Sequence, residues 1–256
     1  YVGLRGLPPE PELPARADYV RLAASGWLDT PIRVDSRYRH ACVGSGGHFS
    51  PTPAADASWM QSWLASLTTD KDLASRLETA AAEAAAQVPA GRIYGASVGH
   101  LHHPLGALVL GHVPESLEQA RRVAIGSRGR FDPDGALRYR APASGMDFGR
   151  TQPGREASGY AAQVVATWLT AAVYAGDRSL IEPALDAVRT LQRRFANGVP
   201  RGAQPWEMPL HTPDILGSAY LVRTFVLAYE VTGDASFLDA ARYWAWTGVP
   251  FVYLRN

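Results

Sequence analysis

The 256-residue chain lacks several features that would assign it to a class at once. Cys42 is the only cysteine, so no disulfide can form within the chain, and no recognisable motif beside it suggests a nucleophile. No apolar run reaches the ~18 residues that a membrane-spanning helix needs. The net charge is +1 and no long run of one sign occurs, which argues against nucleic acid or an anionic membrane as the partner.

Motifs of nucleotide binding and serine-hydrolase chemistry are also missing. The sequence has no Gly-X-Gly-X-X-Gly, no Gly-Lys-Ser/Thr phosphate loop, no His-Glu-X-X-His and no Gly-X-Ser-X-Gly. We therefore expect no cofactor. Aromatic side chains, by contrast, are present in number, with seven Trp and eleven Tyr. Their flat amphipathic rings suit sugar or aromatic ligands as well as core packing.

A repeat near the end of the sequence is the most informative positive feature. Residues 169–191 and residues 226–247 each contain an apolar helical stretch, a Gly-Asp pair and a second helix. The pairs Gly176-Asp177 and Gly233-Asp234 lie 57 residues apart. A period of this length made of helix–turn–helix units is typical of stacked helical hairpins. The sequence therefore predicts an all-α fold.

Short turns and long loops alternate between the predicted helices. These helices cover residues 16–29, 56–67, 73–88, 98–112, 116–125, 159–175, 179–195, 214–231 and 235–246. Asp56 is predicted to cap the second of them. The short turns share one face of the stack, so the long loops share the other, and binding residues favour loops on a rigid scaffold. The segments expected to build the site are residues 91–103, 126–158, 197–214 and 248–256.

The chain is predicted to consist of an extended, loop-rich segment over residues 1–55 and a helical-hairpin domain over residues 56–256. Within residues 199–253, the run AYEVTGDASFLDAARYWA resembles the helix–TGD–helix unit of the six-hairpin (α/α)6-toroid carbohydrate-active enzymes. The resemblance implies an (α/α) toroid and a function among glycoside hydrolases, polysaccharide lyases and sugar epimerases. A full toroid needs six hairpins and about four are found. We therefore expect an incomplete toroid that a missing segment or another chain completes.

The richest candidate segment covers residues 205–214, where a Trp, two carboxylates and a His fall within nine residues. Glycoside hydrolysis needs two carboxyl groups across the scissile bond. Glu207 could be the acid, if burial beside Trp206 raises its pKa, and Asp214 could be the base. The alternatives are a salt bridge from Glu207 to an Arg and a helix cap for Asp214. Trp206 could stack on a sugar ring or simply pack.

A second candidate segment carries two acids and two arginines. Asp147 and Glu156 could pair with Glu207 across a cleft. Arg150 and Arg155 could bind the carboxylates of an acidic sugar or neutralise the nearby acids. A structural ion-pair network is the alternative.

A histidine cluster at residues 100–103 is the third candidate. His100 and His102 could hold zinc, but no carboxylate or Cys partner stands at ligand spacing, so no metal is predicted. The same histidines could act as a general base or bind hydroxyl groups, or be ordinary loop residues.

The favoured function is a glycoside hydrolase of polysaccharide degradation, secreted or periplasmic rather than cytoplasmic. A polysaccharide lyase is the first alternative, and its base and neutraliser would come from His211, His100, Tyr160 and Arg155. A sugar epimerase and a non-catalytic helical-repeat binding module are the others. The expected partner is an oligo- or polysaccharide, not nucleic acid or a membrane.

Overall fold

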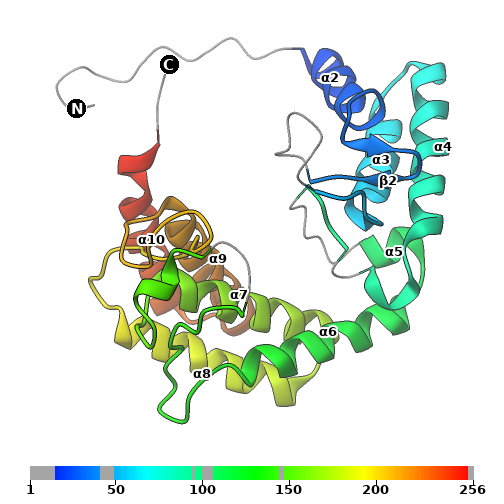
Figure 1. The fold of residues 1–256 in the computed structure, drawn as a ribbon. Helices are drawn as coiled ribbons and strands as arrows, with labels where there is room; N and C mark the ends of the chain where they lie inside the picture. Colours follow the sequence, from blue (N-terminus) through cyan, green and yellow to red (C-terminus); the bar gives the residue numbers. More distant parts are fainter. Residues whose placement is uncertain (1–14, 41–48, 94–95, 100–105, 144–146, 253–256) are drawn as a thin grey trace. The chain divides into compact units, whose positions relative to one another are not determined.

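The computed structural model describes residues 15–40, 49–93, 96–99, 106–143 and 147–252 (Figure 1). These residues are mostly helical, and a single two-stranded sheet is found among them, which confirms the all-α prediction. The chain divides into two compact units, residues 1–119 and 120–256. The predicted boundary at residue 55 lies inside the first unit.

The first unit contains short amphipathic helices that pack around small side chains. Its elements are α2 (Arg16–Leu28), β1 (Arg33–Val34), β2 (Arg37–Tyr38), α3 (Ala55–Leu67), α4 (Lys71–Gln87), η1 (Ala90–Arg92) and α5 (Gly106–Leu110). Helix α6 (Val113–Arg128) begins in this unit and ends in the next. Strands β1 and β2 are antiparallel, with Arg33 opposite Tyr38. Leu64 and Leu77, from α3 and α4, are buried together in one apolar cluster of this unit.

Asp56 does not cap α3, so that prediction is wrong. The helix begins at Ala55 with Ala54 as its N-cap, which places Asp56 inside the first turn. Its side chain is 1% exposed and accepts hydrogen bonds from Ser97 Oγ at 2.8 Å and from the backbone N–H of Gly99 at 2.7 Å. The carboxylate therefore anchors a distant loop to α3 instead of closing the helix end.

The second unit contains the two hairpins that the repeat predicts. Its helices are α7 (Ser158–Ala175), α8 (Arg178–Arg194), α9 (Ile215–Thr232) and α10 (Ala235–Gly248), with short turns η2 (Gly149–Thr151) and η3 (Val249–Phe251). Gly176 and Gly233 end α7 and α9 with φ of 66° and 72°, in the left-handed region that favours glycine. Asp177 and Asp234 then cap α8 and α10 by accepting from Ser179 and Ser236. The Gly-Asp turns are confirmed.

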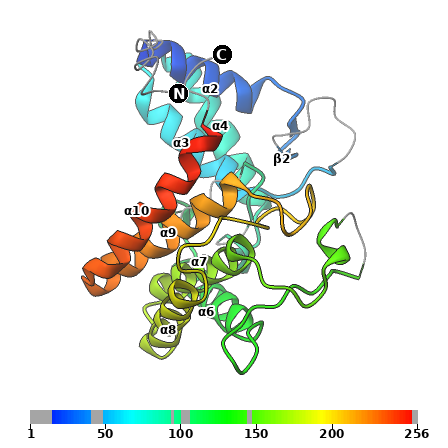
Figure 2. The ribbon, with the colours of Figure 1, turned by 90° about the vertical axis from the view of Figure 1, so that its left-hand side faces the viewer.

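The two hairpins stack through α7 and α9, and α9 lies beside α10 (Figure 2). Gly159 and Gly217 allow the close approach, because a Cβ on Gly159 would lie only 2.8 Å from Gly217 Cα. Further along, Phe225 and Phe237 stack with ring centroids 6.3 Å apart inside the core. The contact between Gly159 and Gly217 holds together the beginnings of α7 and α9, which the long loops precede.

Helix α9 is long and apolar enough to cross a membrane, judged by length and composition alone. One third of it is buried inside the protein, and its buried residues include Leu221 and Phe225. Core helices pass the same test, so this is weak evidence for a span.

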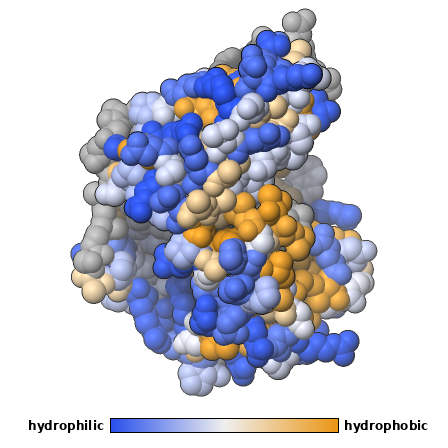
Figure 3. Space-filling model, turned by 90° about the vertical axis from the view of Figure 1, so that its right-hand side faces the viewer, coloured by the Kyte–Doolittle hydropathy of each residue, from blue (hydrophilic) through white to orange (hydrophobic). Residues whose placement is uncertain are grey.

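Some apolar side chains remain exposed, and Figure 3 shows one face of the molecule on which apolar surface gathers among hydrophilic residues. Leu108 and Val109 of α5 are 65% and 58% exposed, for example. Much of any folded protein's surface is apolar, so these side chains do not by themselves define a site.

Candidate functional site

The second unit contains a cleft of about 550 Å³ where two long loops meet beside the start of α7. One wall is formed by residues 151–157, and the other by Arg201, Leu210 and His211. The volume lies within the range of pockets that bind small ligands. Both loops belong to the face on which the sequence predicts the site.

Backbone hydrogen bonds fix the second loop against the ends of α7 and α9. Gly159 N–H donates to Arg201 O at 2.8 Å, and Asp214 N–H donates to Pro200 O at 2.9 Å. Gly202 has φ 73°, and a Cβ there would lie 2.5 Å from the carbonyl oxygen of Leu210, so only glycine fits. Arg201 is therefore presented from a backbone that is held at several points.

Of the charged side chains that line the cleft, the carboxylate is paired with another residue and the arginines are not. Glu156 is the one carboxylate among the lining residues, and it accepts two hydrogen bonds from Arg194, at 2.8 and 2.7 Å. Arg155 and Arg201 are exposed, and neither guanidinium group has a hydrogen-bond or ion-pair partner within the described part of the chain. The cleft therefore presents two guanidinium groups that form no ion pair with a carboxylate of the described residues, while Glu156 pairs with Arg194.

His211 lines the same cleft and is oriented by Gln152. The side-chain amide nitrogen of Gln152 lies 2.9 Å from Nδ1 of His211. In this arrangement the amide donates to Nδ1, so the neutral imidazole carries its proton on Nε2. A half-turn of the amide would present its oxygen and favour the other tautomer. His211 is thus an oriented imidazole that can give a proton at Nε2 in the first arrangement and take one there in the second.

The predicted acid and base of the 205–214 segment have separate hydrogen-bond partners and differ in burial. Asp214 is 2% exposed and accepts from Leu216 N–H at 2.8 Å, so it caps α9, as its alternative interpretation predicts. Its other carboxylate oxygen is buried without a hydrogen-bond partner among the described residues. Glu207 is exposed and accepts from Gln204 at 2.8 Å. The burial on which the acid role of Glu207 depends is therefore not found.

Asp147 and Tyr160 belong to a buried polar cluster outside the cleft lining. Asp147 accepts hydrogen bonds from the Tyr139 hydroxyl and from Gly149 N–H. Burial, and then the hydrogen bond to Asp147, raise the pKa of Tyr139, so this phenol stays protonated and donates. Tyr160 packs edge-on against Tyr139 and accepts from Arg130 at 2.7 Å. The cluster holds the loop that leads to the cleft.

The remaining predicted site residues lie elsewhere. Trp206 is 44% exposed beside Glu207, and Arg150 is exposed on η2, outside the cleft lining. His100 and His102 lie outside the described residues. Across the described ranges, no group of three or more His, Cys, Asp or Glu side chains could hold a metal ion.

Sequence analysis missed Arg201 and Gln152. Both stand in loops that were expected to form the site, and Arg201 stands between Pro200 and Gly202. These two flanking residues were the available signal for Arg201. Nothing in the spacing marks Gln152, because its partner His211 is 59 residues away.

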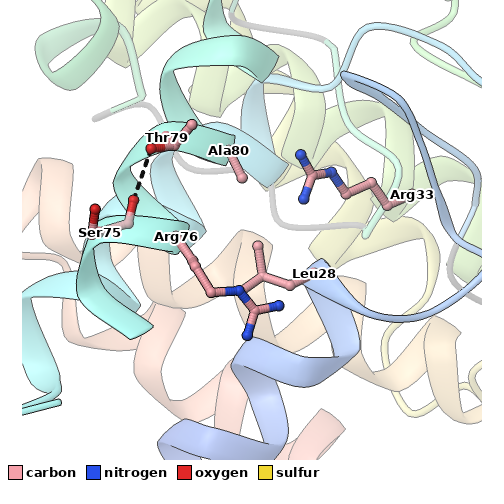
Figure 4. A pocket seen from close by; sticks show the side chains of 6 residues that line it. All are labelled: Leu28, Arg33, Ser75, Arg76, Thr79 and Ala80. Carbon is pink, nitrogen blue, oxygen red and sulfur yellow. Dashed lines mark hydrogen bonds between the residues drawn. The ribbon is translucent and has the colours of Figure 1, made fainter. Parts of the chain in front are cut away.

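A second hollow, of about 250 Å³, lies in the first unit between α2, β1 and α4 (Figure 4). Its two arginines are already paired: Arg33 with Glu83 at 3.0 Å, and Arg76 with Asp29. Thr79 donates to the carbonyl oxygen of Ser75 at 2.9 Å. The hollow therefore offers few unused polar groups to a ligand.

The chain matches no protein-family model, no curated protein and no solved structure. The case for a function accordingly depends on the cleft of the second unit.

Proposed function

We propose that the chain is a carbohydrate-active enzyme of the (α/α)-toroid type that cleaves an acidic polysaccharide. In this proposal Arg155 and Arg201 bind the carboxylate of a uronate residue. The observation that carries it is a pair of arginines in one cleft that have no side-chain partner among the described residues, next to an oriented histidine. Guanidinium groups match carboxylates in geometry as well as charge. The two stacked hairpins support the toroid part of the proposal.

The reaction that this set of groups fits best is β-elimination. Such a reaction removes the proton on the carbon beside the carboxylate and expels the glycosidic oxygen, which leaves an unsaturated sugar. Negative charge builds on the carboxylate as the proton leaves, and Arg155 and Arg201 would stabilise that charge. With the amide oxygen of Gln152 turned towards Nδ1–H, Nε2 of His211 would take the proton from that carbon, and the imidazolium so formed would give it to the departing glycosidic oxygen.

Hydrolysis is a second candidate, favoured by one backbone contact. Phe148 N–H donates to Pro205 O at 2.7 Å, which brings the segments of Asp147 and Glu207 together. Against it, Asp147 is engaged by Tyr139, and Glu207 is exposed. A hydrolase would release a reducing end without an unsaturated product. An epimerase would release no new reducing end, and a binding module would bind sugar without turnover.

A matched pair of substrates tests the carboxylate recognition. One is a polyuronate, and the other is the same polymer with its carboxyl groups reduced to primary alcohols. Charge-assisted hydrogen bonds contribute about 1.5–3 kcal/mol each, so we expect kcat/KM on the reduced polymer to be lower by at least about tenfold. Equal cleavage of the two polymers would contradict the proposal and favour hydrolysis by the carboxylates.

A further inference from the structure

We propose that Phe148 and Trp206 form a second sugar-binding subsite beside the cleft, which takes the pyranose ring of a neighbouring residue of the same acidic oligosaccharide. This inference rests on the proposed function, because it extends the ligand of the cleft. It adds that the ligand is a chain of at least two sugar residues, recognised by charge at one residue and by ring packing at the next.

The two aromatic residues leave the backbone at adjoining points. Phe148 N–H donates to Pro205 O at 2.7 Å, and that carbonyl belongs to the peptide bond that Trp206 completes. Phe148 is 42% exposed and Trp206 is 44% exposed. Neither ring has an aromatic neighbour within the described part of the second unit, so no aromatic side chain of that part covers either ring.

The chemistry of this surface fits a sugar ring. One face of a pyranose consists of C–H groups, which pack on an aromatic ring, while its hydroxyl groups need hydrogen-bond partners. Glu207 is exposed directly after Trp206 and uses one oxygen to accept from Gln204. Its remaining acceptor capacity is available to hydroxyl groups.

Both aromatic residues are close in sequence to residues that line the cleft. From Phe148, the turn η2 leads directly to Gln152, and from Trp206 four residues lead to Leu210 and then His211. The proposed subsite therefore takes the sugar residue next to the one that the arginines bind.

The position of Phe148 is fixed by its neighbours. Asp147 is held by Tyr139, and a Cβ on Gly149 would lie 2.6 Å from Tyr139 Cζ, so the backbone on either side of Phe148 packs closely against Tyr139. A backbone held in this way needs little reordering when a ligand binds at Phe148.

The test measures binding as a function of oligosaccharide length. Titration calorimetry would compare acidic mono-, di-, tri- and tetrasaccharides of one uronate on the full chain, on Trp206→Ala and on Phe148→Ala. Trp246→Ala is the matched control, because Trp246 is 69% exposed on α10 and is not among the residues that line the cleft. Circular dichroism and thermal melting would verify that each variant is folded.

For the unaltered chain, affinity should rise when the ligand grows from one residue to two or three. Each aromatic substitution should reduce that gain by about 3- to 10-fold and leave monosaccharide affinity unchanged. Trp206→Tyr should keep most of the gain, and Trp246→Ala should keep all of it.

Two results would overturn the proposed subsite, and only one of them would also contradict the proposed function of the cleft. Folded Trp206→Ala and Phe148→Ala variants with the full gain would remove the subsite and leave the cleft proposal intact. Failure of the unaltered chain to bind any of these acidic sugars would remove both.

Discussion

Replacing Arg155 and Arg201 together by alanine is expected to lower kcat/KM on a polyuronate by about 10²- to 10⁴-fold. Both side chains line the cleft, and neither has a partner among the described residues. Each would give one charge-assisted interaction with the carboxylate, worth about 1.5–3 kcal/mol. Both are exposed, so their removal disturbs no core packing and the melting temperature should stay close to that of the unaltered chain.

Matched variants separate the geometry of the arginines from their charge. Arg223→Ala removes an exposed arginine of α9 that lies outside the cleft, and it should retain full activity. Lysine at positions 155 and 201 keeps the charge but cannot make the two parallel bonds, so an intermediate loss is expected. Added salt should weaken binding by the unaltered chain more than by the double variant. A double alanine variant with undiminished activity would contradict the assignment of the cleft.

Gly159→Ala is expected to destabilise the second unit by about 1–3 kcal/mol or more. The added Cβ would lie 2.7 Å from Arg201 O and 2.8 Å from Gly217 Cα. Both neighbours are backbone atoms, so no side-chain rotation relieves the clash, and α7 must move away from α9. The free energy of unfolding from denaturant titration measures this effect.

Gly126→Ala is the control for that substitution. Gly126 lies within α6, and a Cβ there meets nothing within 4 Å. Alanine should therefore stabilise the chain by roughly 0.5–1 kcal/mol through helix propensity. If the two substitutions changed stability alike, α7 and α9 would not lie in the close contact that positions Arg201.

Local patterns predicted the hairpins because their determinants are close in sequence. The Gly-Asp turns need only a glycine with positive φ and an aspartate that accepts from the residue two positions on, as at Asp177 and Ser179. The same reasoning gave a wrong prediction for Asp56. It looks like a helix cap, but its partners Ser97 and Gly99 lie 41 and 43 residues away. Whether such a carboxylate caps its own helix or binds a distant loop is decided by tertiary structure.

For the candidate site, too, the sequence predicted local features but not contacts between distant residues. Arg155, Glu156 and His211 could be selected from loops that the hairpin pattern placed on one face. The partner of Glu156 could not, because Arg194 is 38 residues away on α8. The ion pair with Arg194 engages the carboxylate of Glu156, which the sequence suggested for catalysis. Arg155 and Arg201 then remain as the charged side chains of the cleft that can bind a ligand.

Ultraviolet absorbance during digestion tests the central claim most directly. The full chain would be incubated with a panel of polyuronates while absorbance of the unsaturated product and new reducing ends are followed together. We expect the two signals to rise in parallel on at least one acidic polymer, and both to be lost in the double alanine variant at positions 155 and 201. New reducing ends without absorbance, or no product from any acidic polymer, would contradict it.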